Sequence, residues 1–214
     1  MSSSETPRPY RSELRRRQAA ETRRRVVEAA AETFARHGYQ ATTFAKIAKR
    51  ADVSVVTVQK LGTKPALLQA AVELTSFGVE GETDLFATEV GRALLQIQDP
   101  DTLARFFGSA MLAINAPSAG VWMAVGVGAH GSPELRELQA TMLRLIRGQV
   151  EHVLDHIARS GWLRQDVPVD DLVEAFCVIT SVDAYVRFVE RDGRSPERYS
   201  AFVARTIRDT ILAP

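Results

Sequence analysis

The sequence predicts an all-α protein, with a three-helix helix-turn-helix unit at its N-terminus and a longer helical domain behind it. Apolar residues recur at spacings of three and four along most of the chain, as on one face of an α-helix. Two later segments begin with a capping serine, a proline and a glutamate, at Ser132 and at Ser195. No segment alternates polar and apolar residues with a period of two, so we predict no sheet.

Three short helices are expected near the N-terminus. The first begins near residues 21–22 and ends at Gly38, because glycine suits a helix C-cap. Thr43 is the expected N-cap of the second helix, and Ser54 that of a third helix ending near Leu61. After the next break, at Gly62–Pro65, apolar periodicity continues. Further helices are expected at 83–98, 101–115, 119–130, 133–160, 169–191 and 196–212.

The charge is divided unevenly along the chain. Residues 1–64 carry 14 Lys and Arg against 6 Asp and Glu, whereas residues 65–214 carry 13 against 20. A basic end on a nearly neutral chain favours nucleic acid as the partner, although a solvated basic helix with a tail gives the same count. Residues 1–20 are rich in arginine and too poor in apolar residues to pack, which predicts a disordered basic arm. This arm either lies along the DNA groove or backbone or only aids solubility.

The second and third helices predict a rigid unit whose later helix enters the major groove. Val55, Val56 and the methyl group of Thr57 suit contact with thymine methyl groups, unless the valines are buried instead. Gln59 suits adenine, and Lys60 suits guanine or phosphate. Backbone amides and hydroxyls at a helix N-terminus bind phosphate. The predicted DNA-binding residues are Thr43, Lys46, Ser54, Val55, Val56, Thr57, Gln59, Lys60 and Lys64.

Residues 22–68 contain a series of motifs at fixed spacing: His37-Gly38-Tyr39, ATTFAKIA at 41–48, RADVS at 50–54, Thr57-Val58 and GTKPALL at 62–68. This segment resembles the N-terminal domain of the TetR family of transcriptional regulators. The resemblance implies three parts: a disordered basic arm at 1–20, a helix-turn-helix DNA-binding domain at 21–66, and a helical effector-binding and dimerisation domain at 67–214. It also implies a double-stranded DNA operator, a homodimer and a cytoplasmic protein.

The end of the third helix departs from the family pattern. Gln59 occupies the position of a usual tyrosine, which leaves the phosphate contact of that tyrosine open. Leu61-Gly62 replaces a slightly longer segment that contains an aromatic residue. We expect Leu61 to take the place of that aromatic side chain in the core.

The last two long helices are the dimer interface that the resemblance implies. Their apolar stripes are Leu172, Phe176, Ile179, Ala184 and Phe188, followed by Phe202, Val203, Ile207 and Ile211. A symmetric dimer suits a palindromic operator, because both then share a two-fold axis. The alternative is that these stripes pack only inside one subunit.

The uncharged stretch 106–133 is the best candidate for a pocket that takes a small apolar effector. Its small residues either leave space for the ligand or allow helices to pack closely. Five glycines, Asn115 and Pro117 interrupt the stretch, so we expect buried helices rather than a membrane span. The predicted ligand-binding residues are Phe106, Phe107, Met111, Trp122, Met123, His130 and Phe176.

No catalytic residues, metal site or cofactor are predicted. The four histidines form no triad, and His152 and His156 lack the glutamate that follows the first histidine in zinc proteases. The single cysteine, Cys177, lies on an apolar face and is expected in the core. The sequence therefore favours a ligand-responsive homodimeric repressor. The alternatives are a DNA-binding activator, and an all-α enzyme or helical scaffold whose basic end is incidental.

Overall fold

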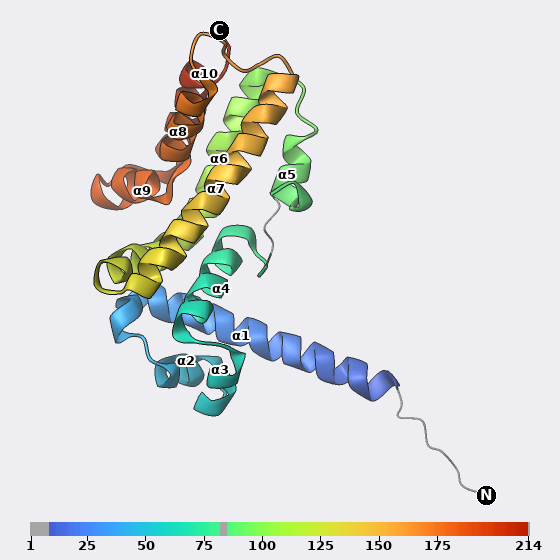
Figure 1. The fold of residues 1–214 in the computed structure, drawn as a ribbon, viewed down its shortest axis with the longest axis vertical. Coiled ribbons are helices and arrows are strands. Elements are labelled where there is room, and N and C mark those ends of the chain that lie inside the picture. Colours follow the sequence, from blue (N-terminus) through green and yellow to red (C-terminus); the bar gives the residue numbers. More distant parts are fainter. Residues whose placement is uncertain (1–8, 82–84, 214) are drawn as a thin grey trace, which may run out of the picture.

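The computed structural model describes residues 9–81 and 85–213, and confirms the predicted all-α class (Figure 1). Within these residues, one isolated antiparallel bridge joins Leu163 to Leu212. The elements, in chain order, are α1 (Pro9–Ala41), α2 (Phe44–Ala51), α3 (Val55–Leu61), α4 (Lys64–Phe77), the 3₁₀-helix η1 (Leu85–Ala87), α5 (Glu89–Leu94), α6 (Pro100–Gly131), α7 (Pro133–Arg159), α8 (Val169–Thr180), α9 (Val182–Tyr185), the π-helix η2 (Val186–Arg191) and α10 (Pro196–Thr210).

Helix α1 begins much earlier than expected. The predicted disorder of residues 9–20 is wrong because these residues are helical, while residues 1–8 lie outside the described part of the chain. A low apolar content prevents packing, but arginine, glutamine, alanine and glutamate all favour helical backbone. At its other end the regular helix is interrupted at Gly38, whose φ of 70° confirms the predicted glycine stop.

Helix α6 is continuous where two helices, at 101–115 and 119–130, were predicted. Pro117 lies within it, exposed to solvent. A proline removes one backbone hydrogen bond, but the apolar residues on both sides of it are buried, and this packing outweighs the local cost. The predicted helix at 83–98 was also wrong in extent, since its described part forms only η1 and the short helix α5.

The predicted helix at 169–191 is divided. Ser181 has extended backbone (ψ 151°) and separates α8 from α9, and the chain then widens into η2. Asn115 of α6 holds this break, because its amide donates to the carbonyl oxygens of Thr180 (3.0 Å) and Ser181 (3.4 Å). The same amide donates to the hydroxyl of the fully buried Tyr199 at 2.9 Å. Carbonyl groups left without partners at a helix end are thereby satisfied from a neighbouring helix.

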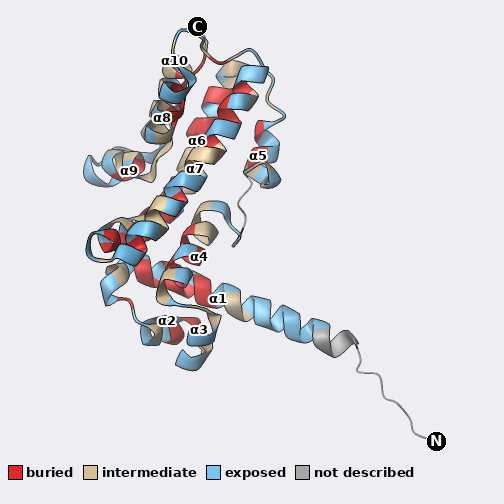
Figure 2. Cartoon of the chain, in the orientation of Figure 1, coloured by how far each residue is buried: buried red, intermediate tan, exposed pale blue. Residues whose placement is uncertain are grey.

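The buried residues form two cores, and α6 contributes to both (Figure 2). We call them the N-terminal core and the C-terminal core. The N-terminal core is built by α1, α2, α3, α4, the second half of α6 and the start of α7, and its largest fully buried side chains are Phe34, Ile47, Leu67, Leu68 and Leu135. The C-terminal core joins the first half of α6 to α5, α7, α8, η2 and α10, and its largest are Tyr199, Leu94, Leu103, Leu154, Ile157, Leu172 and Ile207.

Two glycines of α6 allow other helices to approach closely. A Cβ atom on Gly120 would lie 2.7 Å from the Cβ atom of Ala35 in α1. A Cβ atom on Gly108 would overlap the backbone carbonyl of Ser200 in α10. At these positions the small residues serve close helix packing, which is one of the two roles expected from the sequence.

By length and composition, α6 is also apolar enough to cross a membrane. Within the fold, however, it lies between α1, α4, α7 and α10 and supplies buried residues to both cores. This packing is that of a core helix.

Candidate nucleic-acid interface

Three consecutive helices of the N-terminal domain begin at a hydroxyl cap. The Thr43 hydroxyl accepts from the Lys46 amide (3.2 Å), the Ser54 hydroxyl from the Thr57 amide (3.0 Å), and the Thr63 hydroxyl from the Ala66 amide (3.3 Å). The first two caps were predicted from the sequence. Between α2 and α3 the chain turns at Asp52, which has left-handed backbone (φ 53°). Aspartate tolerates this conformation better than most residues.

Helix α3 presents its predicted reading side chains to solvent. Val58 is fully buried and fixes the helix on the N-terminal core, whereas Val55 and Val56 are 39% and 56% exposed. Gln59 and Lys60 are also exposed. The alternative of buried valines at 55 and 56 is therefore wrong. Exposure of these apolar side chains to water costs free energy, and contact with thymine methyl groups would remove that cost.

Two predicted phosphate-binding lysines are held at the end of α1. The ammonium group of Lys46 donates to the carbonyl of Ala41 at 2.8 Å. The ammonium group of Lys64 lies 4.1 Å from the centre of the Tyr39 ring, a cation–π contact, and burial lowers its pKa. Burial, followed by the charge of Glu134, raises the pKa of Tyr39. Both lysines thus stand at fixed places beside the capped ends of α2 and α4.

Arg23 of α1 ties the far end of α3 to the loop after α4. Its guanidinium binds both carboxylate oxygens of Glu80, at 2.6 and 3.2 Å, and donates to the carbonyl of Leu61 at 3.0 Å. Leu61 is the last residue of α3, and the next residue, Gly62, has a φ of 152° that favours glycine. A planar guanidinium satisfies a carboxylate and a helix-end carbonyl together, so Arg23 holds the end of α3 in position.

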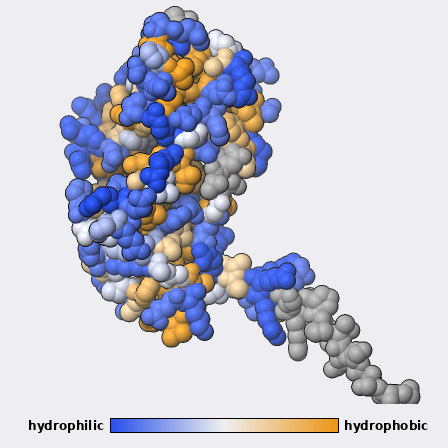
Figure 3. Space-filling model, in the orientation of Figure 1, coloured by the Kyte–Doolittle hydropathy of each residue, from blue (hydrophilic) through white to orange (hydrophobic). Residues whose placement is uncertain are grey.

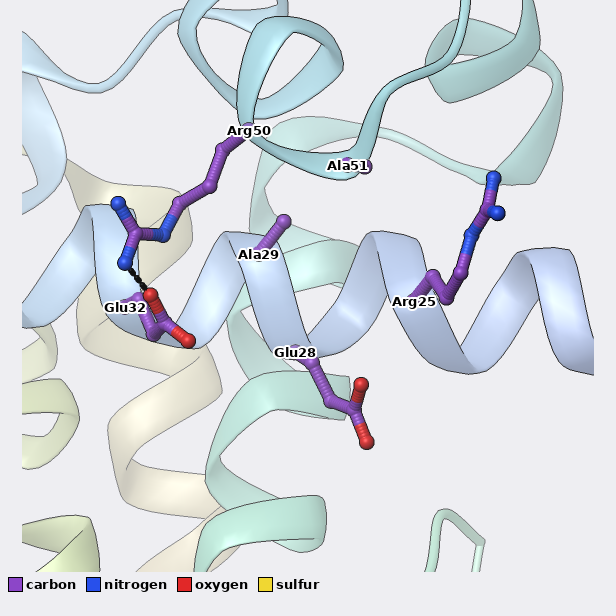
Figure 4. A pocket seen from close by; sticks show the side chains of 6 residues that line it. All are labelled: Arg25, Glu28, Ala29, Glu32, Arg50 and Ala51. Atoms are coloured by element: carbon purple, nitrogen blue, oxygen red, sulfur yellow. Dashed lines mark ion pairs between the residues drawn. The ribbon is translucent and has the colours of Figure 1, made fainter.

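Two surface hollows border this unit. One, of about 400 Å³, lies between α1 and α2 and is lined by Arg25, Glu28, Ala29, Glu32, Arg50 and Ala51 (Figure 4). An ion pair between Arg50 and Glu32 crosses it. The other lies between α1 and the end of α3 and is lined by Gln18, Ala19, Thr22, Thr57, Lys60 and Leu61. The Arg50–Glu32 pair joins α2 to α1, and the second hollow shows that α1 runs beside the end of α3.

The predicted ligand-binding residues are not brought together. Phe107 and Phe176 are buried in the C-terminal core, with ring centres 5.0 Å apart, and Phe106 and Met111 pack against the same core. Trp122 packs instead on the N-terminal core. Met123 and His130 are exposed. Only four of the seven predicted residues therefore lie together, in or against the C-terminal core.

The stripes predicted for dimerisation are largely used within the subunit. Leu172, Phe176, Val203, Ile207 and Ile211 are buried in the C-terminal core, and Ile179, Phe188 and Phe202 pack against it. The exposed aliphatic side chains of α8 are Val169 and Val178, at 56% and 60%. Any pairing of α8 with a second copy would therefore use its outer face, which contains Val178 opposite the buried Leu172, Val173 and Phe176.

The remaining candidate groups are placed as follows. Cys177 is half-buried beside the C-terminal core, and burial raises the pKa of its thiol. His152 is exposed, and the ring of His156 meets the edge of Phe86 at 6.4 Å. The part of the chain that the structure describes contains no cluster of three or more metal-ligating side chains.

The N-terminal unit matches a known sequence family. Residues 26–60 match the model of bacterial regulatory proteins of the tetR family. These residues therefore form a helix-turn-helix of the TetR type. The chain thus has a helix-turn-helix DNA-binding domain of the kind found in these transcription regulators. No curated protein sequence matches the chain significantly.

Solved structures share the fold over most of the chain. A protein of Saccharomonospora viridis, described as a transcriptional regulator and bound to choline, is 19% identical with a TM-score of 0.69, covering 91% of this chain and 100% of its own. A TetR transcription regulator of Haloarcula marismortui is 16% identical (TM-score 0.64; 91% and 100% covered). SmeT of Stenotrophomonas maltophilia, in complex with triclosan, is 18% identical (TM-score 0.65; 90% and 92% covered).

Sequence reasoning missed the pair of Arg23 and Glu80. These residues are 57 positions apart, and Glu80 follows α4 in a segment with no periodic pattern. In a run of basic residues, the sequence does not show which arginine has a structural role, because each is followed and preceded by similar residues. Only the folded contact separates Arg23 from Arg24, which pairs with Glu28 on the exposed side of α1.

Removing Arg23 should loosen the end of α3. Hydrogen bonds to charged groups contribute about 1.5–3 kcal/mol, so R23Q should speed amide hydrogen exchange at residues 58–61 by about tenfold or more. The matched control is R24Q, which removes an exposed pair on the same helix and should leave this exchange unchanged. Equal exchange in the wild-type protein and in R23Q would contradict the positioning role.

Proposed function

We propose that the chain is a sequence-specific DNA-binding repressor that acts as a cytoplasmic homodimer and releases its operator when a small apolar effector binds. The observation that carries the DNA-binding part is the exposed face of α3. It combines two exposed valines, Gln59 and Lys60 on a helix that is capped at Ser54 and held at Leu61. A rigid helix with exposed methyl groups and hydrogen-bonding tips suits the major groove.

The fold supports a dimer that reads two half-sites. A single α3 contacts few base pairs, and a two-fold dimer doubles this contact on a palindromic operator. The outer face of α8, with the exposed Val178, offers apolar surface near the C-terminal core for pairing with a second copy. Isologous contact between two such faces needs no other partner.

The C-terminal core supports effector binding around Phe107 and Phe176. Phe106 and Met111 pack beside these rings, and aromatic and methionine side chains adapt to apolar ligands. Two proteins of the same fold bind small molecules, choline in one case and triclosan in the other. The aromatic lining here favours an apolar, ring-containing effector.

The reading role of α3 is tested by mobility shift on the DNA upstream of the gene and on operators selected from random sequence. Wild-type binding should be sequence-selective and weaken steeply with salt. The variant Q59A/K60A should bind about tenfold or more weakly, since a good base contact contributes about 1–3 kcal/mol. The control Q165A/R136A removes one amide and one charge from the C-terminal domain and should bind as the wild-type protein does. Unchanged binding by Q59A/K60A would exclude α3 as the reading element.

The proposed dimer is tested by sedimentation. V178D places a charge in the proposed interface and should shift the protein toward monomer, because an unpaired buried charge is costly. V127D is the matched control, since Val127 is 72% exposed on α6 and lies outside the proposed interface. A V178D protein that stays dimeric would move the interface away from α8.

The proposed effector site is tested with triclosan as the probe. Binding at about 100 times the dissociation constant adds roughly 2.7 kcal/mol of stability, so the Tm of the wild-type protein should rise by several degrees. The same concentration should weaken operator binding. F106A should reduce both effects, and M123A, on the exposed side of α6, should preserve them. A wild-type Tm that neither triclosan nor choline raises would count against the site.

A further inference from the structure

The described start of α1 stands apart from the body of the protein. Residues 13–21 are all exposed, and the first buried residue of the helix is Val26. Figure 3 shows hydrophilic side chains where this part of α1 leaves the body, and Figure 1 shows the helix projecting past α3. At 1.5 Å per residue, residues 13–21 extend the helix by about 13 Å. We call residues 13–21 the extension.

The extension lies next to the exposed surface of α3. Gln18, Ala19 and Thr22 share a hollow with Thr57, Lys60 and Leu61 of α3. Arg15 precedes Gln18 by three residues and Ala19 by four, so it lies on the same face of α1 one turn further out. Arg16 precedes Ala19 by three residues and lies at the border of that face. Two arginines therefore follow Lys60 along one side of the molecule.

The arginines of α1 differ in their partners. Arg17 pairs with Glu13 at 3.6 Å, Arg24 with Glu28 at 2.9 Å, and Arg23 with Glu80. In the described part of the chain, Arg15 and Arg16 form no ion pair or side-chain hydrogen bond. Their guanidinium groups are thus free to bind an external anion, whereas those of Arg17, Arg23 and Arg24 are already paired.

The extension is a poor helix by itself. It buries none of its side chains, and the first turn of α1, which begins at Pro9, contains no acidic residue that would offset the positive end of the helix dipole. Arginines concentrated at that end repel one another and the dipole, and short isolated helices are marginal in water. A polyanion bound along the side of α1 with Arg15 and Arg16 would reduce both the repulsion between arginines and their repulsion by the helix dipole. The phosphates of DNA are therefore the ligand that best fits this surface.

We propose that the extension is a second DNA-binding element, in which Arg15 and Arg16 contact phosphates of the duplex just outside the half-site read by α3. This rests on the proposed operator binding. An extension of about 13 Å spans roughly four phosphates of one strand. The contacts carry no base information, so they increase affinity and fix register without changing the preferred sequence.

The experiment compares the full-length protein with R15Q/R16Q on two duplexes, by fluorescence anisotropy across a salt series. One duplex is the selected operator alone, and the other has about one helical turn (~10 bp) of random sequence added at each end. On the long duplex the double variant should bind about tenfold more weakly. The slope of log K against log salt should fall by about 0.9 for each lost phosphate contact, close to two per subunit. On the short duplex both proteins should bind alike.

A second readout needs no substitution. Addition of the long duplex should slow amide hydrogen exchange at residues 13–21 by about tenfold, because phosphate contact stabilises the helix. The short duplex should leave that exchange unchanged. The control R136Q/R194Q removes two exposed arginines from the C-terminal domain and should keep the wild-type salt slope on both duplexes.

Three results would overturn the proposal while operator reading by α3 stands. One is an unchanged slope for R15Q/R16Q together with weakened binding by Q59A/K60A. Another is equal weakening on both duplexes, which places the arginines inside the half-site. The third is an altered oligomeric state of R15Q/R16Q in sedimentation, which assigns the arginines to an acidic protein surface. Absence of selective binding by the wild-type protein itself would overturn the operator reading and, with it, the flanking contact.

Discussion

The whole structure depends on the burial of one helix. Helix α6 supplies Leu103 and Phe107 to the C-terminal core, and Val121 and Val125 to the N-terminal core. Apolar burial is roughly proportional to area and has no direction, so a helix without charged residues over most of its length can join two cores at once. The domains are therefore not linked by a flexible segment. They share a helix, and the position of α1 relative to the C-terminal core follows from where each packs on α6.

The two ends of this arrangement are built differently. The recognition end relies on directed interactions: three hydroxyl caps, a left-handed turn at Asp52, and Arg23 bound to Glu80 and to Leu61. Such interactions fix orientation more than they add stability. The C-terminal end relies on aromatic and aliphatic packing, which tolerates changes of shape at similar energy. A rigid surface at one end and an adaptable core at the other fit the proposed repressor, which binds DNA at the first and an effector in the second.

The sequence was most informative where local chemistry decides the structure. Thr43, Ser54 and Gly38 each satisfy or end a helix with their own side chain or backbone, so their roles could be predicted from neighbouring residues. Prediction failed where distant packing outweighs local preference. Pro117 suggested a break that burial on both sides suppresses, and α8 ends at Thr180, where Asn115, 65 positions away, binds its carbonyl.

The same distinction applies to the candidate site. The exposed face of α3 follows from its cap and its short apolar face, and was predicted. The predicted ligand-binding residues were not brought together, because one apolar helix shared by two cores places Phe107 and Trp122 against different neighbours. The apolar composition of residues 106–133 identifies a buried helix, but it does not show which face of that helix packs against which core. Arg23 was indistinguishable from the other arginines until Glu80 was seen beside it.

Pro117 has a mechanical consequence for the shared helix. Proline lacks an amide hydrogen, so the carbonyl of Ala113 loses its partner within the helix, and α6 is least stiff at this point. Beyond the proline, 14 residues reach to Gly131, a lever arm of about 21 Å. A bend of about 10° at Pro117 would displace the far end by nearly 4 Å, to the order of magnitude set by that length. Because Gly120 holds Ala35 at contact distance, α1 would be carried with it. A small change of curvature near the aromatic core is thus enlarged at the end of the molecule that bears α3.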